Sequence, residues 1–241
     1  MSDITAFGGL PNQLDQTKEI IIIGAGGVGK GICQIIKDIN KIKFMWDIIG
    51  FIDEDEGVSG KMINGIPVLG TIDTLQDPRY VDCYVVFAIG DPEAKERIIQ
   101  KVMSKHPNLY CATLIHPSAI ISDEAEIGYG TVVNALVVIE PDSIIGNHVL
   151  IYYGCTVGHD SIIEDYSSLL PQSNVSGNAI LKKCTNLGSN STVIQGIEVG
   201  EYTVIGAGAV VTKSLPNRCT AVGVPAKAIK YRGIEVTILF E

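Results

Sequence analysis

His159 and Asp160 are the adjacent residues of this chain whose types best suit proton transfer. They occur in the run Val-Gly-His-Asp-Ser that begins at Val157. Imidazole titrates near neutral pH, with an unperturbed pKa of about 6.5, and a neighbouring carboxylate can orient the ring and raise its basicity. His148 is the other candidate histidine of the repeat region. For either histidine alone, a surface residue on a turn is the simpler interpretation.

The region that must position His159 repeats with a period of six. Every sixth residue from Ile115 to Val211 is Ile, Leu or Val, and the residue four places later is small in most repeats. Helices have a period of 3.6 and strands a period of two, so this pattern predicts a β-helix of hexapeptides with eighteen residues in each triangular coil. We expect the aliphatic residues to point into the tube and His159, near a corner, to face outwards. Glycines with positive φ are expected at the corner positions Gly128, Gly146, Gly158, Gly188, Gly200 and Gly206.

The N-terminal part of the chain holds a glycine-rich turn in a strand–turn–helix context. An apolar run ends at Ile23, the sequence G-A-G-G-V-G follows, and a helix is expected over 30–39. Such a turn lets backbone N–H groups approach a phosphate at the helix N-terminus. Further strands, expected at 47–52 and 84–89, end next to acidic or glycine residues, and a carboxylate there can accept a hydrogen bond from a ribose hydroxyl. The candidate nucleotide contacts are Gly24, Gly26, Gly27, Asp53, Glu54 and Gly90.

This N-terminal unit is about half the size of a full dinucleotide-binding domain. That size favours a mononucleotide or nucleotide-sugar site over a nicotinamide cofactor. The alternative is a small α/β domain whose glycines serve only the turn. The β-helix follows without a long linker, so the predicted domains are residues 18–112 and 113–241. Residues 1–17 are expected to be a loose tail, the β-helix to close near Pro216 with a loop at 222–227, and Ile234–Phe240 to form a strand.

The composition excludes several classes of function. A net charge of −9 over 241 residues argues against a nucleic-acid partner, which requires clustered Lys and Arg. No apolar run is long enough to span a membrane, and the N-terminus does not resemble a signal peptide. The six cysteines form no C-x-x-C pair, which favours a reduced, cytoplasmic protein without a structural metal. Cys155 takes a small inward position of the repeat and is therefore discounted as a nucleophile.

Eight motifs, in order, support a resemblance to a known family. They are IIGAGGVGKG, GFIDED, FAIGD, LIHPSAIIS, VGHDSIIED, NLGSNSTVIQG, VIGAGAVVTKSLP and VGVPAK. The chain resembles the hexapeptide-repeat acyltransferases, and within them the bacterial enzymes that acetylate a nucleotide-linked 4-amino sugar, together with a sialic acid O-acetylating relative. The resemblance implies a small Rossmann-like α/β domain followed by an all-β left-handed parallel β-helix. It also implies direct transfer from acetyl-CoA to the amino group of a nucleotide sugar, without a metal. The matching motif VGHDSIIED contains His159 and not His148, and only for this reason is His148 the weaker candidate for proton transfer.

The resemblance also assigns roles to residues. His159 is the implied general base and Asp160 supports it, while the backbone N–H of Gly177 would stabilise the oxyanion. Ser189 and Ala207 are implied contacts of the pantetheine arm. Lys227, with Lys213 or Lys230, would meet the phosphates of coenzyme A.

Two positions depart from the family pattern. Relatives usually have a small polar residue seven positions before the histidine, where this chain has Tyr152, taken here as a nucleotide-sugar contact. A second histidine found in many relatives is replaced by Ser168. Acetylation of a sugar hydroxyl and an inactive sugar-nucleotide-binding trimer therefore remain alternatives. A three-sided tube has no deep cleft of its own, so a homotrimer with active sites between subunits is expected.

Overall fold

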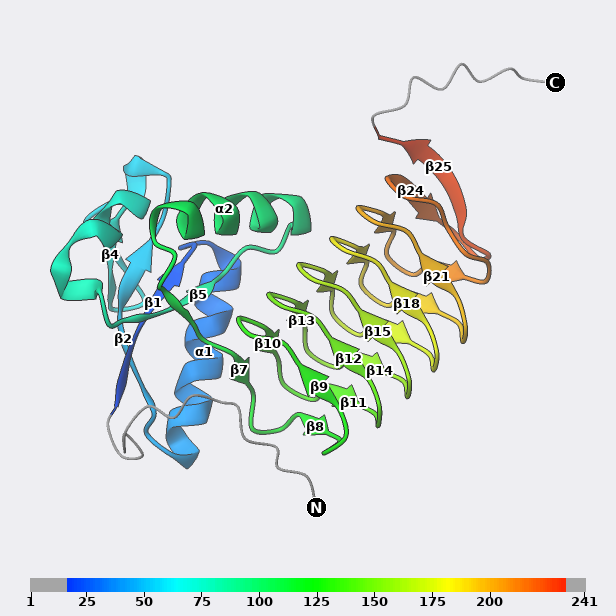
Figure 1. The fold of residues 1–241 in the computed structure, drawn as a ribbon, viewed down its shortest axis with the longest axis horizontal. Coiled ribbons are helices and arrows are strands. Elements are labelled where there is room, and N and C mark those ends of the chain that lie inside the picture. Colours follow the sequence, from blue (N-terminus) through cyan, green and yellow to red (C-terminus); the bar gives the residue numbers. More distant parts are fainter. Residues whose placement is uncertain (1–16, 233–241) are drawn as a thin grey trace, which may run out of the picture.

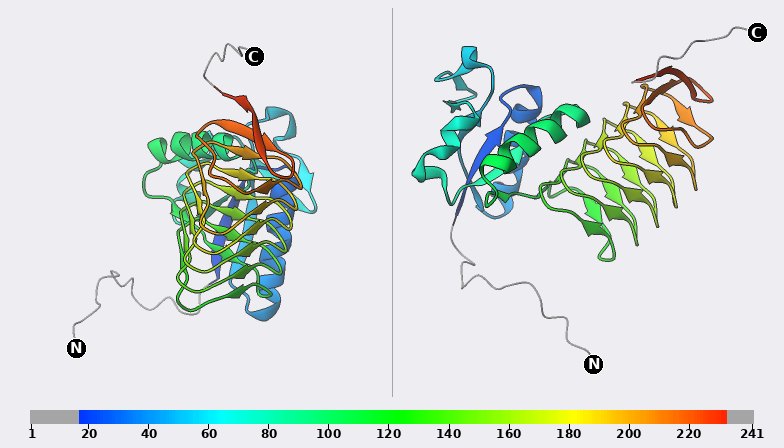
Figure 2. Two further views of the ribbon diagram at one scale, coloured as in Figure 1. Left: turned by 90° about the vertical axis from the view of Figure 1, so that its right-hand side faces the viewer. Right: turned by 45° about the horizontal axis from the view of Figure 1, so that its top comes forward.

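The structure is a computed structural model in which residues 17–232 are described. It consists of an N-terminal α/β domain followed by a long parallel β-helix (Figure 1). In the left view of Figure 2 the coils stand in front of the α/β domain as stacked loops. The strand expected at Ile234–Phe240 and nearly all of the expected N-terminal tail lie outside the described residues.

The α/β domain contains a six-stranded sheet in the order β3-β4-β2-β1-β5-β6. Only the β3–β4 pair is antiparallel. The sequence predicted the three central strands, but it did not predict the short outer strands. The strands are β1 (Lys18–Ile23), β2 (Trp46–Ile52), β3 (Met62–Ile63), β4 (Ile66–Gly70), β5 (Tyr84–Phe87) and β6 (Tyr110–Cys111). The helices are α1 (Gly27–Ile42) and α2 (Pro92–Lys105), with 3₁₀ turns at Glu56–Val58, Ile72–Gln76 and Pro78–Tyr80.

Helix α1 packs between the sheet and the β-helix (Figure 1). Its residues Ile32 and Ile36 are almost fully buried, in one apolar cluster with Leu114, Val132 and Leu150 of the coils. Burying an aliphatic side chain of this size contributes roughly 1.5–3 kcal/mol. The two domains therefore share a hydrophobic core, which fixes their relative position.

Three parallel sheets form the faces of the β-helix. The first face contains β7 (Leu114–Ile115), β10 (Val132–Val133), β13 (Leu150–Ile151), β16 (Ser168–Leu169), β19 (Asn186–Leu187) and β22 (Val204–Ile205), extended by β24 (Cys219–Val222) and β25 (Lys227–Tyr231). The second contains β8 (Ile120–Ile121), β11 (Val138–Ile139), β14 (Thr156–Val157), β17 (Asn174–Val175), β20 (Thr192–Val193) and β23 (Val210–Val211). The third contains β9 (Glu126–Ile127), β12 (Ile144–Ile145), β15 (Ile162–Ile163), β18 (Ile180–Leu181) and β21 (Glu198–Val199).

The corners are named after the faces that they join. The first corner leads from the first face to the second, the second corner from the second to the third, and the third corner back to the first. Strand pairs are offset by eighteen residues, as between Val157 and Val175, so each coil has the predicted length. The predicted inward residues are buried from Val133 onwards. In the first coil Ile115 is 39% exposed, contrary to expectation, because no coil lies below it.

The predicted reason for the corner glycines was wrong. None of the six has a positive φ; positive φ occurs two residues later in the turn, as at Gly130 (69°) and Asp160 (56°). Glycine is needed instead because neighbouring coils approach closely. A Cβ on Gly158 would lie 2.5 Å from the backbone nitrogen of Gly177 in the next coil.

The described part of the β-helix ends in an antiparallel hairpin rather than in an open loop. Strand β24 pairs with β25, and Val222 is opposite Lys227. The loop expected at 222–227 is thus reduced to the tight turn of this hairpin.

Candidate functional site

His159 and Asp160 occupy the second corner, between β14 and β15. Asp160 has the positive φ of this corner, and aspartate is one of the few residues that adopt this conformation readily. The turn directs the His159 side chain outwards, and 57% of it is exposed. Its Nδ1 lies 2.7 Å from Asp160 Oδ2, and this hydrogen bond is the main cause that raises the pKa of His159 above its usual value. The corner therefore presents an oriented imidazole with Nε2 directed away from the carboxylate.

Gly177 lies beside the imidazole, one coil further along the second corner. A Cβ at this position would come within 2.6 Å of His159 Nε2, so the ring occupies space that only glycine leaves free. Among the described residues no acceptor takes the Gly177 N–H. At the equivalent position of the third corner a side chain accepts the corresponding N–H, as Glu164 does for that of Lys183. Gly177 thus combines a backbone N–H without a partner and a missing side chain that leaves room for the imidazole.

Glu140 is a neighbour of His159 that sequence reasoning missed. It lies on the preceding coil of the second corner, and its Oε2 accepts the backbone N–H of His159 at 3.0 Å. Its spacing of nineteen residues, one coil plus one residue, could have indicated this contact.

The residues implied for coenzyme A divide between two corners. Gly177 and Lys213 share the second corner with His159; Lys213 follows it by three coils. Ser189 and Ala207 instead lie on the first corner, after β19 and β22. Lys227 is the first residue of β25 and pairs with Val222, the last residue of β24. It therefore lies at the C-terminal end of the same row of corners. The second face of the β-helix separates the two groups within one chain.

The candidate nucleotide contacts gather around a pocket of about 300 Å³ at the carboxyl ends of β1, β2 and β5. Gly24, Gly26, Asp53, Glu54 and Gly90 are among its lining residues. Gly24 has a φ of +112°, and a Cβ on it would lie 2.7 Å from the carbonyl oxygen of Ala88. A Cβ on Gly26 would meet nothing, so that side of the pocket is open.

The start of α1 at this pocket has no side-chain cap. Gly26 is the N-cap residue, and the first turn contains no acidic residue. Helix α2, in contrast, is capped by Asp91, which accepts the N–H of Ala94. Unpaired N–H groups and the helix dipole favour an anion such as phosphate at the start of α1.

The two predicted acidic contacts differ in their surroundings. Asp53 Oδ2 accepts the Ala25 N–H at 2.7 Å, so this carboxylate holds the glycine turn from the end of β2. Glu54 also lines the pocket, but it is ion-paired with Lys101 of α2 and accepts the N–H of Ile72. The structure therefore ties Glu54 to neighbouring elements and leaves Asp53 directly beside the glycine turn.

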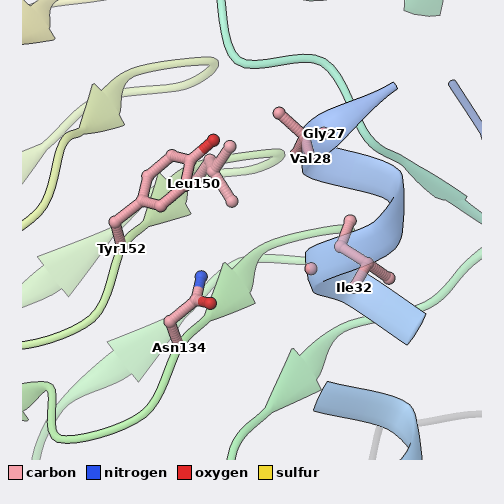
Figure 3. A pocket seen from close by; sticks show the side chains of 7 residues that line it. Gly27, Val28, Ile32, Asn134, Leu150 and Tyr152 are labelled. Atoms are coloured by element: carbon pink, nitrogen blue, oxygen red, sulfur yellow. The ribbon is translucent and has the colours of Figure 1, made fainter. Parts of the chain in front are cut away.

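Gly27 and Tyr152 line a smaller cavity, of about 100 Å³, between α1 and the coils. Figure 3 shows Tyr152 and Asn134 on the coils, with Val28 and Ile32 of α1 opposite. The Tyr152 hydroxyl is 3.6 Å from the position of a Cβ on Gly90, a residue of the nucleotide pocket. Tyr152 lies on the first corner, and the second face separates it from His159.

Three further positions considered in the sequence analysis are buried, namely His148, Ser168 and Cys155. His148 is 3% exposed, its ring stacks on Tyr166 at 5.7 Å, and burial lowers its pKa to about 4. It is therefore unsuited to proton transfer near neutral pH. Ser168 is fully buried under Lys95. Cys155 is also fully buried, and burial raises its pKa, as expected for an inert small residue.

The described residues contain no group of three or more His, Cys, Asp or Glu side chains that could hold a metal ion. Over residues 17–232, no helix has the length and apolar character needed to cross a membrane.

Comparisons with known proteins agree with the fold of this chain. The family model for the PglD N-terminal domain matches residues 19–102. A histidine variant of perosamine N-acetyltransferase from Caulobacter crescentus, solved in complex with CoA and GDP-perosamine, is 30% identical and superposes with a TM-score of 0.81 over 88% of this chain and 97% of that one. The acetyltransferase domain of PglB from Neisseria gonorrhoeae, in complex with acetyl coenzyme A, is 26% identical with a TM-score of 0.79, over 89% and 100% of the two chains.

A curated relative matches over a shorter stretch. The dTDP-3-amino-3,6-dideoxy-α-D-galactopyranose 3-N-acetyltransferase of Aneurinibacillus thermoaerophilus is 42% identical over 55 residues, which is 23% of this chain. The chain spans only 29% of the length of that relative.

Proposed function

The chain belongs to the hexapeptide-repeat nucleotide-sugar acetyltransferases, a family of acetyl-CoA-dependent enzymes, and we propose that it acetylates the amino group of a nucleotide-linked amino sugar. The observation that carries this proposal is the exposed His159–Asp160 pair beside the free N–H of Gly177. The same chain provides a pocket with the features of a nucleotide site. These are the parts needed to activate an amine and to hold its carrier.

His159 acts as the general base. The sugar amine attacks the thioester carbonyl, and Nε2 removes a proton as the C–N bond forms. The tetrahedral intermediate then breaks its C–S bond, and the imidazolium returns the proton to the departing thiolate. A positioned base of this kind contributes roughly 10²–10⁴-fold to the rate. Asp160 holds the Nδ1–H and so keeps Nε2 free to accept a proton.

Gly177 supplies the oxyanion donor in this mechanism. Its N–H is unpaired among the described residues, and Gly177 is the residue whose missing Cβ leaves space for Nε2. A single well-placed donor is worth roughly 3–4 kcal/mol of transition-state stabilisation.

The α/β domain holds the nucleotide of the acceptor. The uncapped start of α1 receives the phosphates, and Asp53 accepts a hydrogen bond from the ribose. Gly26 and Gly27, where a Cβ would meet nothing, leave room for the ligand beside Gly24 and Gly90, and the Tyr152 hydroxyl reaches towards Gly90 from the coils. We expect this domain to bind a nucleotide sugar rather than NAD, since the described chain has one such glycine turn in a half-sized domain.

Coenzyme A and the assembly are linked in this proposal. Ser189, Ala207 and Lys227 lie on a different corner from His159, so one chain does not bring all the coenzyme A contacts together. The first corner of a second copy, placed beside the second corner of this one, would complete the site. Cyclic closure with three copies suits a three-sided tube, and the protein is therefore proposed to be a homotrimer.

The cysteines of the described chain are all free, which fits a reducing cytoplasm.

Release of the CoA thiol from acetyl-CoA tests the reaction directly. Amino sugars linked to UDP, GDP and dTDP are offered as acceptors, each beside the analogue that has a hydroxyl in place of the amine. We expect thiol release with at least one amino sugar, none with its hydroxyl analogue, and a mass gain of one acetyl group on the product. Release with the hydroxyl analogues alone would make the protein an O-acetyltransferase, and no release with any acceptor would favour a binding protein.

A further inference from the structure

Glu140 contacts the main chain of the residue that carries the proposed base. It follows β11 at the second corner, and its Oε2 accepts the N–H of His159 at 3.0 Å from the coil below. A second hydrogen bond comes from the coil above, where the N–H of Asn178 donates to the carbonyl oxygen of His159 at 2.8 Å. The peptide groups of the histidine turn are thus held from both sides, which fixes where the imidazole leaves the backbone.

The same hydrogen bond occurs elsewhere in the β-helix without a histidine. Glu164 accepts the N–H of Lys183, also nineteen residues later, at 2.9 Å. This repetition shows that the contact by itself is a way of satisfying a corner N–H. Glu140 differs from Glu164 in two respects. The residue whose N–H it accepts is a histidine, and its negative charge lies close to the imidazole of that histidine.

Within residues 17–232, two carboxylates are the charged groups that face the imidazole. Asp160 of the same turn is hydrogen-bonded to Nδ1, and Glu140 faces it from the coil below. The coil above presents Gly177 and Asn178, which carry no charge. Both carboxylates raise the pKa of His159, the Asp160 hydrogen bond most strongly.

We propose that Glu140 is a positioning residue for the acetyl transfer, which holds the His159 turn against Gly177 and stabilises the imidazolium formed when the amine loses its proton. This inference depends on the proposed function for its effect on turnover. Its effect on His159 itself does not depend on any substrate, and the two can be measured separately.

Two substitutions separate the hydrogen bond from the charge. Glu140→Gln retains an oxygen that can accept the His159 N–H but removes the charge, whereas Glu140→Ala removes both. NMR titration follows the pKa of His159, whose signal is assigned by its loss in His159→Ala. We expect this pKa to fall in both variants, and the acidic limb of kcat/KM to move to lower pH with it. Both variants should lower kcat, Glu140→Gln modestly through the lost charge and Glu140→Ala by roughly tenfold or more because the turn is also released, with little change in KM for acetyl-CoA.

Matched controls exclude a purely structural effect. Glu164→Gln alters the same hydrogen bond at the third corner, and Asp142→Asn removes an exposed carboxylate from the turn of Glu140 at a position of positive φ that asparagine tolerates. Neither should move the His159 titration. An unchanged titration in Glu140→Gln, or an equal shift in Glu164→Gln, would overturn the inference. If the wild-type protein acetylates no acceptor, the proposed function is wrong. The NMR titration still shows whether Glu140 raises the pKa of His159, so the two failures can be distinguished.

Discussion

His159 is expected to contribute to chemistry and little to stability. Its side chain is more than half exposed and belongs to none of the hydrophobic clusters. Replacing it with alanine should lower kcat at least ~100-fold, as loss of a general base does. The thermal midpoint should change by only a few degrees. Steady-state kinetics with an accepted amino sugar, together with a thermal melt, measure both, and full activity of the variant would remove His159 from the mechanism.

Gly177 offers a test of the geometry rather than of the chemical group. The backbone of Gly177 is not in the positive-φ region, so alanine is compatible with its conformation. Its Cβ, however, would lie 2.6 Å from His159 Nε2 and would displace the ring. We expect Gly177→Ala to fold, to retain acetyl-CoA binding and to lose about 10²-fold in kcat, because a shift of about 1 Å can cost that much.

Thermal melts and single-turnover kinetics of Gly177→Ala make this comparison. Normal turnover in a folded variant would show that the ring can move aside without loss, and the proposed place of the acetyl group would be wrong.

At the scale of elements, the uncapped start of α1 predicts opposite effects on stability and on binding. Gly26 has extended φ and ψ, and a side chain there would meet nothing. In Gly26→Asp the new carboxylate can cap the helix, which contributes a few tenths of a kcal/mol relative to glycine. The same carboxylate would repel a phosphate from this site. We therefore expect equal or higher stability and at least ~10-fold weaker nucleotide-sugar binding by calorimetry.

Gly26→Asn is the matched control for this prediction, because it caps the helix without adding charge. It should bind the nucleotide sugar more tightly than Gly26→Asp. Equal affinity in the two variants would show that phosphate does not bind at the start of α1.

At the scale of the whole molecule, α2 joins the two domains through a buried lysine. Lys95 is 1% exposed, and its Nζ donates to the carbonyl oxygen of Ser167 and to Ser168 Oγ, each at 3.1 Å. Ser168 stands where many relatives are expected to have a histidine. Burial lowers the pKa of Lys95 from 10.5 to about 7. Burial thus favours the neutral form of the Lys95 amine. Protonating this amine in the folded protein lowers the free energy of unfolding.

This shift predicts how stability depends on pH. Between about pH 7 and pH 10.5 the unfolded chain binds a proton at Lys95 that the folded chain does not, so the contribution of Lys95 to stability rises with pH. The slope is at most about 1.4 kcal/mol per pH unit. Lys95→Met removes this dependence. The thermal midpoint of Lys95→Met minus that of the wild type should decrease from pH 6.5 to pH 9.

Lys105→Met is the control, since Lys105 lies on the same helix but pairs with Asp73 at the surface. Its difference from the wild type should stay constant over this pH range. A constant difference for Lys95→Met as well would mean that the amine remains charged when buried.

The assembly is tested by sedimentation equilibrium. Because the coenzyme A contacts divide between two corners of one chain, we expect three copies per particle at micromolar concentration and activity only in that form. A fully active monomer at the same concentration would show that one chain holds a complete site.

The sequence by itself determined those features that depend on local repetition. The period of six predicted the coil length, the inward residues from Val133 onwards and the outward place of His159. The eighteen-residue spacing also placed Gly177 beside it. Such features follow from the chain because each coil packs mainly against its neighbours.

Only the tertiary structure decided how distant segments meet. It showed that Gly158 is required by the next coil and not by positive φ, that His148 is buried under aromatic side chains, and that Glu140 holds the histidine turn. It also placed Tyr152 against the α/β domain, across a face from His159. These outcomes depend on close approach, desolvation and the packing of one domain on another. They are set by the summed contacts of the folded chain, and no periodicity along the sequence encodes them.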